Sequence, residues 1–291
     1  MPELPDVEGF RRLLAGSASG QPIRRVSVPA PEILRNTSPQ RLGRALSGQR
    51  LGQPQRHGKW LCAPAGPQML VLHFGMDGSL QWVPAGRLAA SRRVAADRLV
   101  LLCRDGELRY RSVRKLGGVW LAGSPEEVAA VTGPQGPDAL TLDQAGLAGR
   151  LAGRRGAVKP ALMSQSVIAG LGNLTVDEVL WRARIHPRIP VGRLGAPGLR
   201  RLHGAVQEVL AAAVPAGRVP GYEGWLTGAR DERAAACPRC GTRLSRGRVG
   251  GRGTVWCPRC QTGWRSAVLP DAGPALRGTF PCRRPRRSRR R

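Results

Sequence analysis

Two short cysteine pairs near the end of the chain constrain its fold more than any other feature. Cys237 and Cys240 enclose Pro-Arg, Cys257 and Cys260 enclose the same dipeptide, and 16 residues separate the two pairs. Two such knuckles on a hairpin place four thiolates tetrahedrally around one Zn²⁺ ion. A pair of redox Cys-x-x-Cys motifs is the alternative, but no thioredoxin-like βαβ pattern surrounds them. Because four cysteines leave no open coordination position, the sequence predicts one structural zinc ion.

The composition favours a polyanionic partner. The chain has 291 residues, enough for two domains with separate cores, and a formal net charge of +28. This excess of basic residues, nearly all of them arginine, favours nucleic acid. No apolar run is long enough to span a membrane, and no secretory signal precedes the first motif. We therefore expect no membrane partner and a cytoplasmic, nucleoid-associated location.

The first half of the chain indicates an antiparallel β structure behind one helix. Apolar residues at helical spacing predict that helix over residues 7–14. Short strand-like runs follow, with turn signals between them, at residues 23–28, 49–55, 60–63, 69–74, 79–83, 98–103, 107–113 and 118–122. Eight short strands at this spacing predict an antiparallel sandwich or barrel.

The pattern changes to helix near residue 124. Thr141 and Gln144 read as a capping box that opens the helical region. The end of the chain is rich in Pro, Gly and Arg and has no core residues, so we expect it to be disordered. The predicted class is α+β. Its predicted units are a β-sandwich at 1–133, a linker at 134–140, a helical domain at 141–235, a zinc finger at 236–270 and a disordered tail at 271–291.

The first residues carry a candidate nucleophile beside an acid. Removal of Met1 exposes the secondary amine of Pro2, with the carboxylate of Glu3 next to it. An α-amine has a reference pKa of about 8, so roughly a tenth of it is free base at neutral pH. A secondary amine condenses with an aldehyde carbon to a charged iminium, and Glu3 can donate a proton to a departing group. The alternative is a plain helix start, with Pro5 and Asp6 in the first turn.

Three glycine-containing turns carry further candidates. Residues 170–173, Gly-Leu-Gly-Asn, predict a turn that feeds a helix capped by Asn173, where free N–H groups bind a phosphate. Lys59 falls on a hairpin-like turn, and Met76 on a glycine-flanked turn from which an apolar side chain can wedge into a base stack. The first two turns also have a purely structural interpretation, as a chain reversal and as a solvated turn, whereas Met76 is hard to explain as a core residue.

Together, in their order along the chain, these motifs resemble the formamidopyrimidine-DNA glycosylase / endonuclease VIII family over about residues 2–262. The resemblance implies a two-sheet β-sandwich catalytic domain, a helix–two-turns–helix DNA-binding domain and a β-hairpin zinc finger. It implies a monomeric enzyme that binds double-stranded DNA with a damaged base or an abasic site. The implied reaction is excision of an oxidised base and strand cleavage by β,δ-elimination through an iminium.

The resemblance also assigns a role to each candidate residue. Pro2 matches the nucleophile, Glu3 the catalytic acid, Lys59 the hairpin lysine near the lesion and Glu178 the acidic residue of the helix after the glycine-rich turn. The residues that match phosphate contacts are Lys59, His73, Asn173 and Arg252. The residues that match the side chains filling the gap of a flipped base are Met76, Arg114 and Leu116.

Three departures from the family pattern concern the lesion more than the chemistry. Leu116 stands where Phe is common, and Thr175 stands where Tyr is usual. Only 22 residues separate Val214 from Cys237, too few for the long lesion-capping loop of the 8-oxoguanine branch. We therefore expect a chain closer to the endonuclease VIII-like branch, with abasic sites, oxidised pyrimidines or ring-opened purines processed better than 8-oxoguanine.

Two other functions remain open from sequence. A catalytically silent damage- or DNA-binding protein of the same fold is disfavoured by the intact Pro2 and Glu3, which a pure binder does not need. A generic zinc-ribbon nucleic-acid module leaves the N-terminal motif unexplained.

Overall fold

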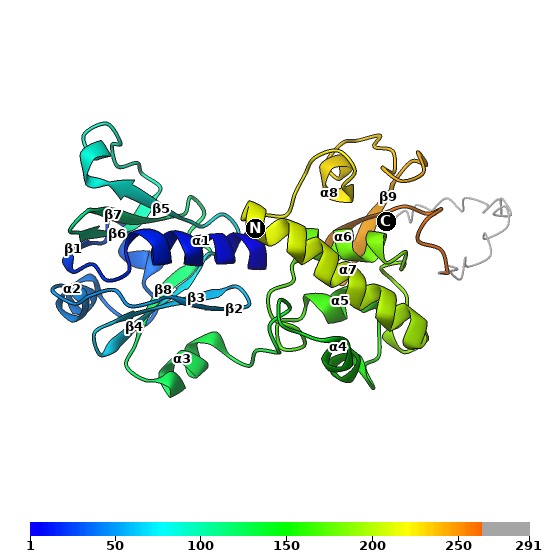
Figure 1. Ribbon diagram of the computed structural model, residues 1–291, viewed down its shortest axis with the longest axis horizontal. Helices are drawn as coiled ribbons and strands as arrows, with labels where there is room; N and C mark the ends of the chain where they lie inside the picture. Colours follow the sequence, from blue (N-terminus) through cyan, green and yellow to red (C-terminus); the bar gives the residue numbers. More distant parts are fainter. Residues whose placement is uncertain (264–291) are drawn as a thin grey trace, which may run out of the picture.

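The computed structural model describes residues 1–263 of the chain. The arginine-rich tail predicted at 271–291, and the last residues of the predicted zinc finger, lie outside the described residues. The first part of the chain forms a β-rich half and the second part a helical half, which lie next to one another along the long axis (Figure 1). This arrangement confirms the predicted α+β class. Among residues 1–263, no helix is both long and apolar enough to cross a membrane.

The β-rich half is a sandwich of two four-stranded antiparallel sheets. One sheet has the strand order β1-β6-β7-β5 and the other β2-β3-β4-β8. Alternate residues along β3, β4, β6 and β7, most of them apolar, point between the sheets and share one buried core. The strands are β1 Ile23–Ser27, β2 Gln55–His57, β3 Trp60–Ala65, β4 Gln68–His73, β5 Ser79–Pro84, β6 Asp97–Cys103, β7 Gly106–Arg111 and β8 Gly118–Ala122.

The strand predicted at residues 49–55 is wrong for most of its length. Arg50 and Leu51 make only isolated bridges to neighbouring segments, and the regular strand β2 begins at Gln55. Pro54, which has no N–H group to donate to a ladder, lies between these bridges and β2.

The helical half buries the faces that apolar periodicity predicts. Helix α7 packs Leu202, Val206 and Leu210 into a core shared with α4, α5 and α6. Helix α4 is capped by Asp143, which accepts a hydrogen bond from the Gly146 N–H at 2.7 Å, so the capping box predicted from Thr141 is wrong. The helices are α1 Leu4–Ser17, α2 Pro39–Leu46, α3 Pro125–Thr132, α4 Gln144–Leu151, α5 Val158–Met163, α6 Asn173–Arg182, α7 Gly195–Ala216 and α8 Leu226–Ala229.

Helix α1 belongs to both halves. Leu4 lies in the core of the helical half, whereas Val7 and Leu14 of the same helix lie in the core of the sandwich. The Leu4 N–H donates to the Gly170 carbonyl at 3.1 Å. A Cβ atom on Gly170, whose φ is +105°, would lie 2.5 Å from the Leu4 side chain, so this close approach requires glycine. The two cores therefore meet at the N-terminus of the chain (Figure 1).

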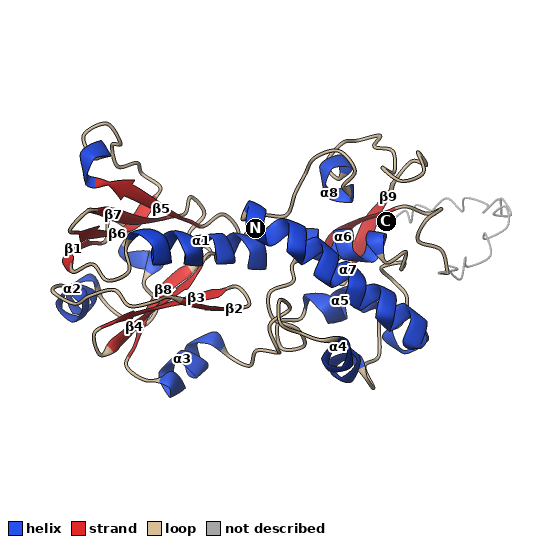
Figure 2. Cartoon of the chain, in the orientation of Figure 1, coloured by secondary structure: helices blue, strands red, loops and turns tan. Residues whose placement is uncertain are grey.

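The zinc-finger segment docks on the helical half through a small core of its own. Strands β9 Ser245–Val249 and β10 Arg252–Trp256 form an antiparallel hairpin, drawn as two red strands beside α6 in Figure 2. Trp181 of α6 packs with Leu226, Leu244 and Val255. The finger is thus fixed to the helix that begins at Asn173.

A buried ion cluster joins the two halves. The Arg56 guanidinium contacts Asp138 at 2.5 and 3.0 Å and Glu8 at 3.1 Å. Asp138 also accepts the Gly58 N–H at 2.7 Å. The side chains of Arg56, Glu8 and Asp138 are at most 10% exposed. The segment predicted as a linker therefore holds the β2–β3 turn in place.

We predict that Arg56→Met lowers the free energy of unfolding by about 3 kcal/mol, because it leaves Asp138 in a buried site without its cation and removes one of the three arginines that pair with Glu8. Urea denaturation followed by circular dichroism measures this loss. Arg104→Met is the matched control, because the Arg104–Asp105 pair is exposed and such pairs contribute less than about 1 kcal/mol. Equal losses in the two variants would contradict a role for the cluster in joining the halves.

Candidate active site

The Glu3 carboxylate lies at the N-terminus of helix α6. Its Oε1 atom accepts the Leu174 N–H at 2.9 Å, and its Oε2 atom accepts the Thr175 N–H at 3.0 Å and the Thr175 hydroxyl. Glu3 is only 1% exposed. The first N–H groups of a helix have no partner within the helix, and the helix dipole favours an anion there. Helix α6 therefore fixes the orientation of the Glu3 side chain.

The glycine-rich turn at residues 170–173 lets the Glu3 carboxylate approach the start of α6. The N–H groups there bind Glu3 and are not free for a phosphate. A Cβ atom on Gly172 would lie 2.2 Å from the Glu3 carboxylate carbon, so only glycine allows the approach. The predicted cap at Asn173 is wrong, because Gly172 is the cap residue and Asn173 is the first residue of the helix. Asn173 donates from Nδ2 to the Gly253 carbonyl at 3.0 Å, and its buried Oδ1 has no hydrogen-bond partner within residues 1–263.

Pro2 borders a cavity at the junction of the two halves. The cavity has a volume of about 360 Å³, and its lining also includes Asp6, Met76 and Arg218. This volume is in the range of pockets that bind small ligands. The Glu3 N–H donates to Asp6 at 2.8 Å, and burial raises the pKa of the Asp6 carboxyl. Sequence reasoning missed Asp6 and Arg218 as site residues, since it read Asp6 only as a helix-dipole partner.

Lys59 and His73 form the cationic side of the site. Lys59 lies half-buried on the β2–β3 turn. Burial and the charge of Arg252 lower the pKa of Lys59, while the charge of Glu3 opposes that shift. Burial and the charge of Lys59 lower the pKa of His73 to about 4, so the ring is neutral at pH 7. The Gly75 N–H donates to His73 Nδ1 at 3.3 Å, which leaves Nε2 as the protonated nitrogen and a hydrogen-bond donor.

Two exposed apolar side chains lie on neighbouring loops that one carboxylate holds together. Met76 is 42% exposed and Leu116 is 54% exposed. Asp77 accepts hydrogen bonds from the N–H groups of Val113 and Arg114, both at 2.8 Å. Burial opposes ionisation of Asp77, but the Arg114 N–H, the Ser112 hydroxyl and the Val113 N–H lower its pKa overall. Asp77 therefore holds the loop of Arg114 and Leu116 against the loop of Met76, a contact that the sequence did not reveal.

Glu178 lies away from the Glu3 carboxylate and anchors the segment after α7. It is fully buried, and it accepts from Arg182 Nε at 2.9 Å and from the Thr227 N–H at 3.1 Å. Burial raises the pKa of Glu178, and both partners oppose this shift. The Thr227 hydroxyl also donates to the Pro220 carbonyl, so Glu178 helps to hold the segment that follows Arg218.

Arg252 is exposed at the start of β10, next to Gly253, whose backbone carbonyl accepts three hydrogen bonds. The Gly253 carbonyl accepts from Asn173 at 3.0 Å, Lys159 at 3.1 Å and Arg230 at 2.9 Å. Lys159 is fully buried and also pairs with Asp177 at 2.6 Å. The hairpin is therefore tied to α5 and α6, which fixes the backbone that carries Arg252.

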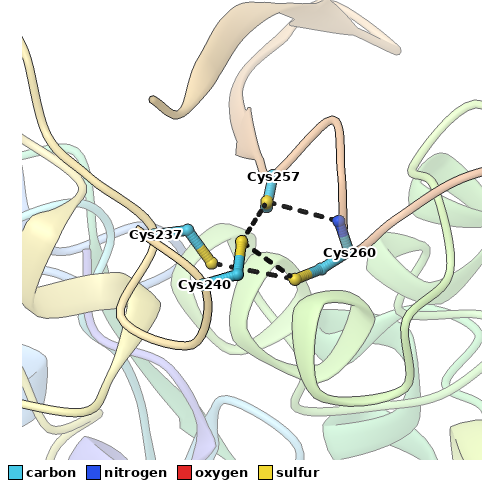
Figure 3. Close-up of side chains that lie close together, drawn as sticks. All are labelled: Cys237, Cys240, Cys257 and Cys260. Atoms are coloured by element: carbon cyan, nitrogen blue, oxygen red, sulfur yellow. Dashed lines mark hydrogen bonds between the residues drawn. The ribbon is translucent and has the colours of Figure 1, made fainter. Parts of the chain in front are cut away.

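The four cysteines of the two knuckles converge as predicted. The sulfur atoms of Cys237, Cys240, Cys257 and Cys260 all lie within 4.8 Å of one another (Figure 3). A tetrahedral zinc site with bonds of about 2.3 Å has sulfur–sulfur distances of about 3.8 Å. The Trp181 indole N–H donates to the Cys237 sulfur at 3.3 Å. The residues therefore fit one structural Zn²⁺ ion. The remaining described cysteines, Cys62 and Cys103, lie on strands, and burial raises the pKa of each to about 11.

Comparison with known proteins agrees with this architecture. Three family models match the chain: the formamidopyrimidine-DNA glycosylase N-terminal domain at residues 1–119, the H2TH domain of the same glycosylase at 135–220, and the zinc finger found in FPG and IleRS at 236–263. Formamidopyrimidine-DNA glycosylase of Symbiobacterium thermophilum is 37% identical over 275 residues, which cover 90% of this chain and 89% of that protein. The Bacillus subtilis protein of the same name is 35% identical and covers 90% of this chain and 99% of that protein.

Solved structures show the same fold in complex with DNA. A complex of the LlFpg protein with a THF-DNA and an inhibitor has a TM-score of 0.80 and 29% identity, covering 90% of this chain and all of that one. A complex of Lactococcus lactis FPG (MutM) with a FAPY-dG containing DNA has a TM-score of 0.79 at 29% identity, with the same coverage. A structure of MutM with a carbocyclic 8-oxo-G containing DNA has a TM-score of 0.79.

The fold and the site define a DNA repair glycosylase that combines a β-sandwich, an H2TH domain and a zinc finger. The chain belongs to the formamidopyrimidine-DNA glycosylase family, whose members are bifunctional glycosylases and abasic-site lyases. The predicted family, fold, enzyme class and zinc ion are thereby confirmed, whereas the expected place nearer the endonuclease VIII-like branch stays a prediction. The individual roles predicted for the site residues stay predictions.

We predict that stability falls as the pH drops from about 6.5 to about 4, in part through His73. The folded-state pKa of His73 is about 4, against 6.5 for an unperturbed histidine, so the unfolded chain binds more protons within this window. The stability present above pH 6.5 is therefore lost on acidification. In His73→Gln, proton uptake on unfolding at pH 5 should fall by about one. Urea unfolding over a pH series measures this uptake, and an unchanged value would contradict a neutral His73.

Proposed function

We propose that Pro2 and Glu3 carry out base excision and strand cleavage on oxidised DNA. The observation that carries this proposal is the position of the N-terminus. Pro2 borders the cavity at the meeting point of the two cores, next to a carboxylate that α6 holds in one orientation. A nucleophile beside an oriented acid is the arrangement that such a reaction requires.

The proposed steps follow from the chemistry of a secondary amine. Glu3 donates a proton to the sugar-ring oxygen as the Pro2 nitrogen bonds to C1′ of the damaged nucleotide, so the bond from C1′ to that oxygen breaks and the ring opens. The base then leaves C1′ with the proton that the Pro2 nitrogen gives up, and the nitrogen lone pair forms an iminium between Pro2 and C1′. The iminium withdraws electrons, so loss of a C2′ proton expels the 3′ phosphate. A second elimination then expels the 5′ phosphate.

The cations and exposed apolar side chains suit the proposed DNA contacts. Lys59, neutral His73 and Arg252 each present a donor for a phosphate oxygen, and Asn173 lies beside Arg252. Met76, Arg114 and Leu116 lie on the two loops that Asp77 holds together, where they would fill the gap left by a flipped base. The domain limits predicted from sequence, a monomeric state and a location with the chromosome in the cytoplasm are part of this proposal.

We predict that Pro2→Gly, or an uncleaved tag before Pro2, strongly reduces both base release and the adduct trapped by borohydride on abasic-site DNA.

Glu3→Gln should keep the fold and DNA affinity but slow base release by about 100-fold or more, because an amide cannot donate the proton. Glu126→Gln, an exposed change on α3, is the matched control. Full activity with a tag on Pro2 would rule out its role, and trapping by wild type would exclude a silent DNA-binding protein.

We propose in addition that the short segment after α7 limits recognition of 8-oxoguanine. Within this segment, Arg218 and Val219 line the cavity and Tyr222 is 61% exposed. Leu116 is also a smaller wedge than the Phe common in the family. We predict faster single-turnover excision of oxidised pyrimidines or ring-opened purines than of 8-oxoguanine, measured on duplexes with one lesion each. A strong preference for 8-oxoguanine opposite cytosine would overturn this proposal.

A further inference from the structure

The hydrogen bonds to the two oxygens of Glu3 are unequal. Oε1 accepts one hydrogen bond, from the Leu174 N–H at 2.9 Å. Oε2 accepts two, from the Thr175 N–H at 3.0 Å and from the Thr175 hydroxyl. A carboxylate oxygen has two lone pairs, so Oε2 is saturated and Oε1 keeps one site. One residue, Thr175, supplies both donors that create this asymmetry.

The Thr175 hydroxyl has a local alternative that it does not use. A threonine hydroxyl inside a helix commonly bonds to a backbone carbonyl three or four residues earlier. In α6 the Gly172 carbonyl, three residues before Thr175, accepts the Val176 N–H at 2.9 Å. The Thr175 hydroxyl donates instead to Glu3, at a contact where Thr175 is 0% and Glu3 1% exposed. Water cannot easily replace a donor in so closed a site.

We propose that Thr175 is a positioning residue that makes Oε1 the oxygen of Glu3 that gives and takes the proton. All three hydrogen bonds persist in both protonation states of Glu3 when the proton resides on Oε1. A proton on Oε2 would require the loss of one donor in a buried site, which is unfavourable. This inference rests on the proposed role of Glu3 as the acid.

Three variants separate the hydroxyl from the shape of the side chain. Thr175→Val replaces the hydroxyl by a methyl group, Thr175→Ala removes both groups, and Thr175→Ser keeps the hydroxyl. Thr132→Val, on α3, is a control for the loss of a threonine hydroxyl away from the cavity. Thermal unfolding and circular dichroism report whether each variant is folded, and Thr175→Ala serves if the valine variant is not.

The measurements distinguish the protonation step from binding and from the amine chemistry. Base release is followed in single turnover at saturating enzyme on a duplex with one oxidised base. Adduct formation with borohydride is followed on a preformed abasic site, and affinity is measured on a tetrahydrofuran-containing duplex. We expect Thr175→Val and Thr175→Ala to slow base release by about 10- to 100-fold, the effect of losing one hydrogen bond to a charged group. Adduct formation and affinity should stay near wild type, and Thr175→Ser should restore base release.

Each outcome decides the proposal. Wild-type base release in Thr175→Val and Thr175→Ala would overturn it, as would a serine variant as slow as the valine variant. A parallel loss of affinity, trapping and base release would show a structural role only, and would also overturn it. Measuring Glu3→Gln alongside distinguishes a failure of the role proposed for Glu3 from a failure of the role proposed for Thr175. If Glu3→Gln releases the base normally, the role of Glu3 fails, whereas if only Glu3→Gln is slow, the role of Thr175 fails.

Discussion

The contact between the Glu3 carboxylate and the first turn of α6 is the interaction on which the rest of the site depends. It joins the N-terminus of the chain to a helix some 170 residues away, through two backbone N–H groups and one hydroxyl. Those N–H groups need an acceptor from outside the helix because no helix carbonyl reaches them, and the helix dipole favours an anion as that acceptor. The glycines at 170 and 172 are required because any side chain would collide with Leu4 or Glu3. The same contact therefore caps the N-terminus of α6 and orients the Glu3 carboxylate.

Around this contact, buried ion pairs set the relative position of the two halves and the position of the β9–β10 hairpin on the helical half. Arg56 connects Glu8 of α1 with Asp138, and Asp138 in turn holds the turn that carries Lys59. On the other side, Lys159 and Asp177 connect α5 and α6 with the hairpin that carries Arg252. Buried ion pairs contribute little net stability but strongly penalise any arrangement that separates the charges. They suit a junction that has to keep its geometry when DNA binds.

The zinc finger and the loop with Asp77 illustrate two ways of presenting a side chain. The four-cysteine site and the Trp181 core fix a hairpin that has few apolar residues of its own. The Asp77 carboxylate achieves the same for residues 112–117 with three hydrogen bonds. In both cases the exposed residue does not hold its own position, because buried partners elsewhere in the chain hold the backbone beneath it.

The sequence by itself determined the α+β class, most strands, the zinc ligands and the N-terminal motif, because these depend on local periodicity, short spacings and adjacent residues. It misplaced the strand at 49–55. It also misplaced the cap of α4, where Thr141 and Asp143 compete for the same helix end, and the cap of α6, where Glu3 from far along the chain supplies the acceptor. It missed Asp6, Asp77, Thr175 and Arg218 as partners of the site. Their contacts join residues far apart in the chain, or depend on which face of a loop is buried. Only tertiary packing decided that the N–H groups of α6 bind Glu3 instead of a phosphate, because that choice required two cores to meet at one helix end.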